Sequence, residues 1–520
     1  MNPVYSNIGY HGSSGKKSDT PKLHMVEPTE TSASTPSARP DSFAPIMARE
    51  GGLKRALGAR QLSMIAIGGA IGTGLFLGSG FAISTAGPAV LVSYAIGALI
   101  SLLLMGCLAE MTVTHPTTGS FGAYAEHYVG PLAGFLVRYA YWSCLVLAVG
   151  TEVTAVAIYM HYWYPAIAGW LWILGFSALL IAVNARGVAL FGGIEYTFSL
   201  IKLVAIAGFI VLASDVLLTN AVRSAGAMGS ARAGIGFRNY LEHGGFMPHG
   251  LGGIWVAVIM AVFSYLSIEM IAIAAGEAVN PQLAITRAFR ATVVRLVVFY
   301  LLTLSLMLAI LPWTQAGVAT SPFVIVMQML HIPGAAGIMN ALLLIAALSA
   351  MNSQLYITTR MLFSLARAGQ APRALGALSA GGTPRKALLA STAGIALAAW
   401  LSVRSPQSAF LSMVAISSFG AMFTWLMIFV THYCFRRKRR ALGSAGFSMW
   451  GFPVTTLAGA VAMLALLLTT PFTAAFRMTL LFGVPFLVFL IALYGLRYRS
   501  GVARRELAGV RGGSQATKIE

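Results

Sequence analysis

The feature that most constrains this chain is a set of long apolar runs that contain no Asp, Glu, Lys or Arg. Two of them cover residues 61–109 and 296–359. About 20 apolar helical residues are enough to cross the hydrocarbon core of a bilayer. The runs do not alternate as barrel strands do, and backbone in lipid must satisfy its own hydrogen bonds. They therefore predict an all-α polytopic membrane protein.

The composition excludes other classes. Of the 520 residues, 57% are hydrophobic and 10% are charged, whereas a soluble protein has about 25% charged residues. This deficit excludes a soluble domain, and the apolar excess excludes a disordered chain. The three cysteines lie in apolar stretches and are expected to fill space. The nine histidines show no metal-binding spacing, so we expect no metal and no cofactor.

Gly, Pro and Asn residues divide the apolar segments into twelve predicted transmembrane helices. Their expected bounds are 62–86, 89–113, 131–160, 166–184, 193–218, 251–278, 289–313, 336–366, 386–402, 407–434, 453–471 and 475–497. Residues 1–52 are rich in Ser, Thr, Pro and charge, which predicts a disordered cytoplasmic tail. Residues 498–520 are expected to form a second cytoplasmic tail.

The basic residues are divided unequally between the two sides of this layout. Apart from Lys202, which falls within a span, nearly all Lys and Arg lie on one side. The exceptions are Arg223, Arg232, Arg238, Arg404 and Arg477. The basic side is expected to be cytoplasmic, with both termini there. Topology thus accounts for the net charge of +20, and no nucleic-acid partner is expected.

The first predicted span holds six glycines between residues 68 and 80. Each glycine costs a helix about 1 kcal/mol relative to alanine, so their density predicts a break around Gly72-Thr73-Gly74. Such a break would expose backbone N–H groups that attract a carboxylate. Close packing of helices is the alternative, because Gly68 and Gly72 have GxxxG spacing.

The segment Ile67-Gly68-Gly69-Ala70-Ile71-Gly72-Thr73-Gly74-Leu75-Phe76 resembles the first-helix signature of the amino acid permeases. This family is a branch of the amino acid–polyamine–organocation superfamily. Further similar segments follow in order, among them Ala86-Gly87-Pro88, Ala109-Glu110-Met111, Glu152-Val153-Thr154-Ala155, Ile201-Lys202 and Ser349-Ala350-Met351-Asn352-Ser353. The resemblance covers about residues 53–440.

The resemblance implies a LeuT-type fold within a transporter core at 53–434. Two inverted five-helix repeats would occupy about 62–218 and 251–434, and two additional helices would follow within 435–497. The first and sixth helices would both be discontinuous and meet at the substrate.

The resemblance also implies a substrate site. Backbone amides would hold an amino acid carboxylate near Ile71, Gly72, Thr73 and Gly74. Carbonyl groups of the sixth helix would meet the ammonium group near Phe263, Ser264 and Tyr265. Glu269 is the first acidic candidate for binding the substrate ammonium or handling a proton, with structural pairing as the alternative. Ser267 stands where the family usually has glycine.

Lys202 lies inside the fifth predicted span. A charged residue there is a functional-site hypothesis, because an unpaired ammonium in lipid is costly. A lysine that snorkels to the interface is the alternative. By resemblance, Lys202 would carry the proton and contact carbonyls near Gly68 and a polar residue such as Ser353.

Three other acidic residues in or beside spans are singled out as candidates. Glu110 is expected to anchor the loop that follows it. Glu152 takes part either in coupling or in structure. Glu277 forms a cytoplasmic gate or ion pair, with a role in transport chemistry as the alternative.

The sequence and the resemblance together predict proton-coupled uptake of amino acids across the plasma membrane by alternating access. No Walker motif is present, so a gradient must supply the energy. An amino acid or amine exchanger, a channel and a sensor are the alternatives; no nucleophile–base pair indicates an enzyme. The expected partners are an amino acid, a proton and the lipid bilayer. Glu269 as the sole extra charge favours a neutral substrate, although a cationic side chain could pair with it.

Overall fold

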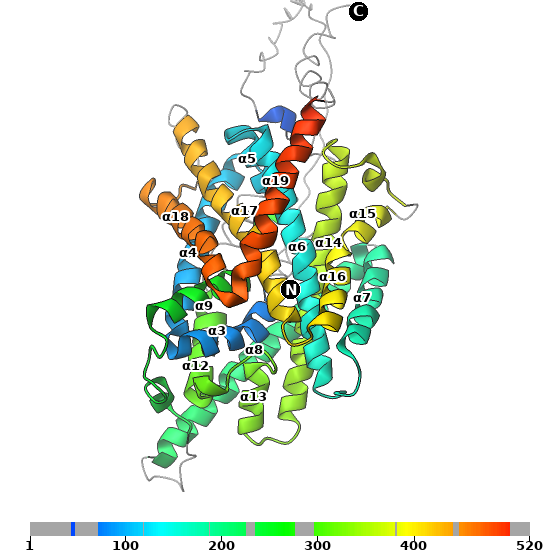
Figure 1. Cartoon of the computed structure of the whole chain (residues 1–520). Helices are drawn as coiled ribbons and strands as arrows, with labels where there is room; N and C mark the ends of the chain where they lie inside the picture. The colour runs from blue at the N-terminus through cyan, green and yellow to red at the C-terminus, as the bar shows by residue number, and fades with distance from the viewer. Residues whose placement is uncertain are drawn as a thin grey trace, which may run out of the picture. The chain divides into compact units, whose positions relative to one another are not determined.

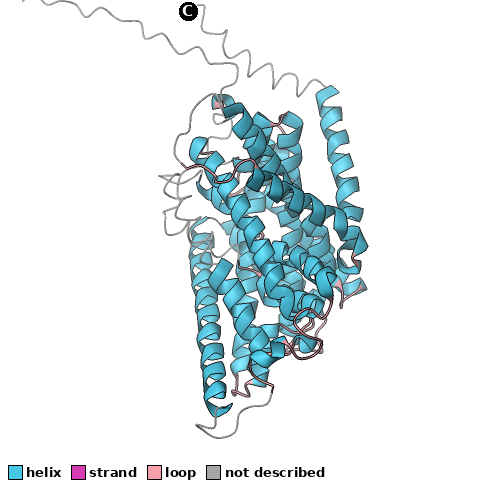
Figure 2. Cartoon of the chain, turned by 90° about the vertical axis from the view of Figure 1, so that its left-hand side faces the viewer, coloured by secondary structure: helices cyan, strands magenta, loops and turns pink. Residues whose placement is uncertain are grey.

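The computed structural model describes residues 43–46, 71–117, 119–186, 188–224, 234–275, 296–379, 382–439 and 447–499. The regular elements in these ranges are all helices, and no strand occurs among them (Figure 2). This confirms the all-α class. Gly68, Glu277 and most of both predicted tails lie outside the described residues.

The longer helices follow the apolar runs of the sequence. They are α3 (Ser79–Ala86), α4 (Val90–Thr114), α5 (Ser120–Tyr128), α6 (Pro131–His161), α7 (Gly169–Arg186), α8 (Val188–Ser224), α9 (Gly250–Ser264), α12 (Thr303–Ile310), α13 (Pro322–Met329), α14 (Ala335–Arg367), α16 (Ala393–Arg404), α17 (Ala409–Arg439), α18 (Val454–Thr469) and α19 (Arg477–Arg499). The short helices α10 (Met270–Ala275) and α15 (Arg385–Ala390) complete the α-helices used below.

Nine helical stretches among the described residues are long and apolar enough to cross a membrane. The first, Gly74–Thr114, takes in the first two predicted spans, and eight others coincide with later ones. The shorter apolar helices Gly250–Ser264 and Val298–Ile310 fall where the sixth and seventh were predicted. The chain is thus a multi-pass membrane protein, and the count of twelve stays a prediction.

Helix α6 lies between α17 and α14 (Figure 1) and packs against both, and also against α16. Small residues allow the close approach. A Cβ atom on Gly394 would lie 1.8 Å from the Val146 carbonyl oxygen, and one on Gly420 would lie 2.3 Å from the Ala140 oxygen. Such contacts drive helix association where lipid offers no hydrophobic advantage.

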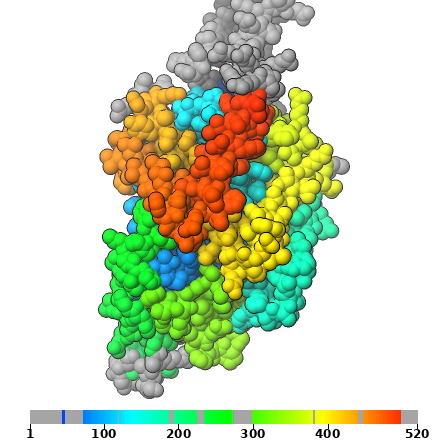
Figure 3. Space-filling model, viewed as in Figure 1, coloured from blue at the N-terminus to red at the C-terminus, as the bar shows by residue number. Residues whose placement is uncertain are grey.

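The last two long helices present apolar side chains outward. They cover part of the face seen in Figure 3, where α19 exposes Leu481, Phe482 and Val488 to between 51% and 59%. An extended apolar surface of this kind marks contact with lipid or a partner. In a multi-pass membrane protein it is the lipid-facing surface.

Glu110 anchors a different loop from the one expected. Its Oε2 accepts hydrogen bonds from His432 Nε2 at 3.1 Å and from the Met449 amide at 2.8 Å. Its Oε1 lies 2.7 Å from Arg436 Nε. The carboxylate therefore ties α4 to α17 and to the segment that leads into α18.

Residues 43–46 fall within the predicted N-terminal tail, yet Phe43 is buried against the core. Its ring stacks on His115, with ring centroids 4.4 Å apart. Burial, together with the charges of His127 and Arg439, lowers the pKa of His115 to about 4. The imidazole is therefore neutral near pH 7, which suits packing against an apolar ring.

The contact between α6 and α16 yields a stability prediction. Gly394→Ala should lower the free energy of unfolding by about 1–3 kcal/mol, because the new methyl group meets backbone that must shift. Gly175→Ala is the control, since nothing lies within 4 Å of a Cβ at Gly175 in α7. Thermal unfolding in detergent should show a lower midpoint for the first variant alone. Equal midpoints would contradict the packing described.

Candidate functional site

The backbone of the first predicted span, 62–86, is irregular where its described part begins. Ile71 and Gly72 form a bend, helical geometry begins at Thr73, and Gly74–Gly78 wind as a π-helix before α3. Single π-helical turns often accompany functional sites. The half predicted to precede the bend lies outside the described residues.

A carboxylate occupies the start of this half-helix. The Thr73 amide donates a hydrogen bond of 3.2 Å to Oε2 of Glu152, a residue of α6. A Cβ atom on Gly72 would lie 2.5 Å from the other carboxylate oxygen, so glycine is needed for this approach. Backbone N–H groups at a helix start bind anions, and here they bind one supplied by the protein.

Lys202 is bound at the same bend. Its side chain is 1% exposed, and Nζ donates a hydrogen bond of 3.1 Å to the Ile71 carbonyl. The ammonium also interacts electrostatically with Glu152 and with Glu195. The side chain points into the protein, so the snorkelling alternative does not describe it.

The sixth span is interrupted. Helix α9 ends at Ser264, a turn covers 265–269, and α10 begins at Met270. Ser267 has a φ of 79°, in the left-handed region that favours glycine. The serine therefore adopts a backbone conformation that glycine adopts more readily, at a position where the resemblance leads one to expect glycine.

The two interruptions are in direct contact. A Cβ atom on Gly74 would lie 2.6 Å from the Ser264 Cα. The Ser264 carbonyl accepts a hydrogen bond of 2.9 Å from the Tyr300 hydroxyl, and the Ser264 hydroxyl lies 3.0 Å from that of Tyr94. The Tyr265 hydroxyl donates to the Tyr94 carbonyl at 2.9 Å. Tyr300 thus satisfies a carbonyl group of the sixth span, and Phe263 is buried next to Ser264.

Glu269 is fully buried, and its Oε1 accepts a hydrogen bond of 3.2 Å from the Ser267 amide. Tyr141 and Trp425 interact with this carboxylate electrostatically. Within the described part of the chain, Glu269 Oε2, the Tyr141 hydroxyl and the Trp425 N–H make no hydrogen bond. The three polar atoms thus form one buried cluster around the Glu269 carboxylate.

The sequence was also compared with protein families and with curated proteins. The family model described as amino acid permease matches residues 61–504. The chain belongs to the amino acid permease family. This confirms the resemblance, and it makes the protein one that moves amino acids across a membrane.

Curated relatives are 36% to 37% identical to this chain over the aligned residues. An uncharacterized amino acid permease, YtnA, of Bacillus subtilis is 36% identical over 88% of this chain and 97% of its own length. The γ-aminobutyric acid permease of the same species is 37% identical over 83% and 91%, respectively. The aromatic amino acid transport protein AroP of Salmonella typhimurium is 37% identical over 81% and 91%.

The permease contains one buried acid that sequence reasoning missed. Glu195 of α8 is fully buried, and its carboxylate accepts hydrogen bonds from Ser349 at 2.7 Å and Asn352 at 3.2 Å. Ser353 is buried beside it and interacts with the same carboxylate. The available signal was the seven-residue spacing from Glu195 to Lys202, which places both on one helical face.

No group of three or more His, Cys, Asp or Glu in the described ranges is placed to hold a metal ion. The predicted roles of the site residues stay predictions.

Ser267 gives a prediction about backbone strain. Ser267→Gly should raise the free energy of unfolding by about 1 kcal/mol, because glycine adopts a positive φ without a steric penalty. Ser267→Ala is the matched control, since it removes the hydroxyl but keeps the strain. In thermal unfolding, the glycine variant should melt above the wild type and the alanine variant should not. A glycine variant that melts lower would show that the hydroxyl, not strain, dominates here.

Proposed function

We propose that this permease is a proton-coupled amino acid symporter of the plasma membrane that works by alternating access. The proposal includes twelve spans, a LeuT-type core and cytoplasmic termini. One observation carries it: a buried ammonium, Lys202, and a buried carboxylate, Glu152, are bound to the same bend of the first helix. A bend that binds both signs of charge suits a zwitterionic substrate and a transported proton.

The amides at Ile71, Gly72, Thr73 and Gly74 would bind the substrate carboxylate. Glu152 accepts a hydrogen bond from the Thr73 amide, so substrate and Glu152 would compete for this amide. Protonation weakens the competitor, because a neutral carboxyl group is a weaker acceptor than a carboxylate. Proton binding and substrate binding would then favour each other.

The other end of the substrate would lie toward the sixth-helix turn. The Ser264 carbonyl has one hydrogen bond, from Tyr300, and a carbonyl can accept a second. Glu269 adds a buried carboxyl group, with the Tyr141 hydroxyl and the Trp425 N–H beside it. These groups suit an ammonium and a small polar neighbour.

A substrate without side-chain charge is favoured. Glu269 is the single acidic group at the sixth-helix turn, and binding the substrate ammonium would occupy it. The names of two relatives, a γ-aminobutyric acid permease and an aromatic amino acid transport protein, agree with this class. Proteoliposome uptake with each of the twenty amino acids, with and without a pH gradient, would identify the substrate.

Lys202→Met should abolish accumulation driven by a pH gradient, because methionine fills the space but carries no proton. Lys386→Met, at an exposed position of α15, is the control and should accumulate substrate as the wild type does. The measurement is labelled substrate retained by proteoliposomes with an acidic exterior.

Two outcomes would contradict this account. Undiminished uphill uptake by folded Lys202→Met would remove the carrier role from Lys202. Wild-type counterflow without a gradient, combined with no net uptake when a gradient is imposed, would identify an exchanger instead.

Glu152→Gln tests the competition directly. In the wild type, the apparent affinity for substrate should rise as the pH falls, because protonated Glu152 releases the Thr73 amide. The glutamine variant, which never carries the negative charge, should bind with an affinity that changes little with pH. KM measured as a function of pH would show this, and an unaltered pH dependence in the variant would exclude Glu152 as the competitor.

A further inference from the structure

We propose that Glu195 accepts the transported proton from Lys202 and passes it to water in a small cavity beside Asn184. The cavity lies on the side of the protein predicted to be cytoplasmic. This inference rests on the proposed proton coupling and adds a residue to which the family resemblance assigns no role.

Glu195 is held in a polar setting within the membrane-spanning part. Its Oε1 accepts hydrogen bonds from Ser349 at 2.7 Å and from Ser199 at 3.3 Å, and its Oε2 accepts one from Asn352 at 3.2 Å. These donors are neutral. A buried acid in lipid surroundings is costly and is by default a functional-site hypothesis. Among the described residues, the cation that interacts with Glu195 is Lys202, which can itself lose a proton.

The register of α8 places Lys202 between Glu195 and the substrate site. The two residues are seven positions apart and share a helical face. Lys202 binds the Ile71 carbonyl at the first-helix bend, whereas Glu195 lies nearer the start of α8 at Val188. The lysine can thus receive a proton at the bend and lose it toward Glu195.

Beyond Glu195 the polar chain continues to Asn184 of α7. Asn184 donates to the Asn352 side chain at 2.9 Å and to the Leu180 carbonyl at 3.0 Å. Asn352 in turn binds Glu195. These side-chain amides do not take up the transported proton. They fix the position of the Glu195 carboxylate and connect it to residues that line the cavity.

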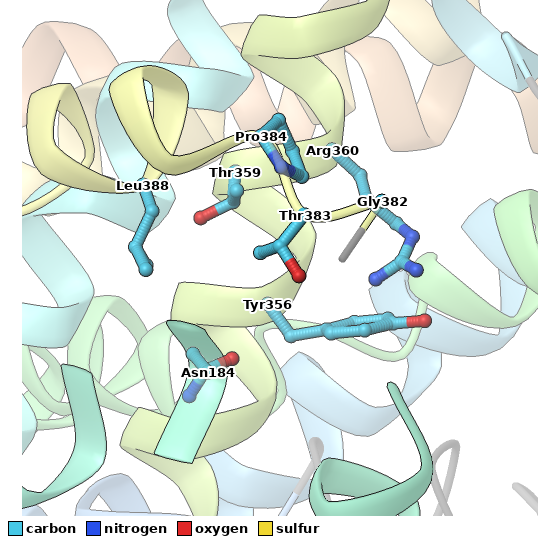
Figure 4. Close-up of a pocket in the computed structure, with 8 residues that line it drawn as sticks. All are labelled: Asn184, Tyr356, Thr359, Arg360, Gly382, Thr383, Pro384 and Leu388. Atoms are coloured by element: carbon cyan, nitrogen blue, oxygen red, sulfur yellow. The ribbon is translucent and has the colours of Figure 1, made fainter. Parts of the chain in front are cut away.

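Asn184 lines one side of the cavity (Figure 4), which has a volume of about 30 Å³. That is room for about two water molecules. Thr359 and Thr383 contribute hydroxyl groups, and the Arg360 guanidinium stands 3.5 Å from the centre of the Tyr356 ring. A cavity with these polar groups can hold the water that accepts the proton.

The transfer balances without any added reactant. The Lys202 ammonium loses a proton to the Glu195 carboxylate, giving a neutral amine and a carboxylic acid; water then takes the proton and restores the carboxylate. The charged groups near this route are Lys202 on α8, Glu152 on α6 and Arg360 on α14. The residue of α7 that lies along this route is Asn184, which is neutral.

Glu195→Gln tests the proposal in proteoliposomes of the full chain. Glutamine keeps the size and part of the hydrogen bonding but cannot accept the proton. Three quantities are measured. Substrate accumulation and luminal acidification are followed under a pH gradient, the latter with a trapped pH-sensitive dye. Substrate counterflow is measured without a gradient. Glu242→Gln is the matched control, because Glu242 is exposed in the segment between α8 and α9.

The expected result is loss of accumulation and of substrate-dependent acidification, with counterflow retained. Normal accumulation by a folded variant would overturn the proposal. Loss of accumulation and counterflow together in a folded variant would also overturn it, since that is the result of a purely structural role. If the wild type itself shows no gradient dependence, the proposed symport fails first and this inference falls with it.

Asn184→Leu is the second variant and decides the case if Glu195→Gln does not fold. It removes the link between the cavity and Asn352 while leaving Glu195 in place. Gradient-driven accumulation should fall below that of the wild type with counterflow retained. Wild-type accumulation by folded Asn184→Leu would overturn the route through the cavity.

Discussion

Backbone N–H and carbonyl groups that lack a helical hydrogen bond inside the membrane need other partners. This requirement determines which side chains lie at the centre of the protein. Water is absent from the hydrocarbon core, so each freed N–H or carbonyl group must be satisfied by the protein or by a guest. The Thr73 amide is satisfied by Glu152, the Ile71 carbonyl by Lys202 and the Ser264 carbonyl by Tyr300. The first two partners can exchange protons, which connects backbone geometry with proton coupling.

Long straight helices supply the frame that brings these partners together. Helix α6 carries Glu152, α8 carries Lys202 and Glu195, and α14 carries the side chains that bind Glu195. Glycines at the crossings allow backbones to approach closely, as at Gly394 against Val146. The short interrupted elements are thus held by long ones that keep their hydrogen bonds, so the site can rearrange without loss of the fold.

Apolar runs and glycine density act locally, so the sequence was sufficient to predict the helical class and an irregular backbone around Gly72-Thr73-Gly74. The family and the discontinuity of the sixth helix came from the resemblance of its motifs. Contacts between residues far apart in the chain could not be predicted from the sequence. The pairing of Glu110 with His432 joins residues 322 positions apart, and Glu195 escaped notice because its burial depends on α14. The positive φ of Ser267 follows the family pattern, although residue preference alone does not favour serine there.

The central claim is that the first-helix bend is an anion site which Glu152 fills until substrate displaces it. A cryo-electron microscopy structure with bound amino acid tests this most directly. The account predicts the substrate carboxylate on the amides at residues 72–74, with the Glu152 carboxylate moved off the Thr73 amide. A bound amino acid elsewhere, with Glu152 still hydrogen-bonded to Thr73, would contradict it.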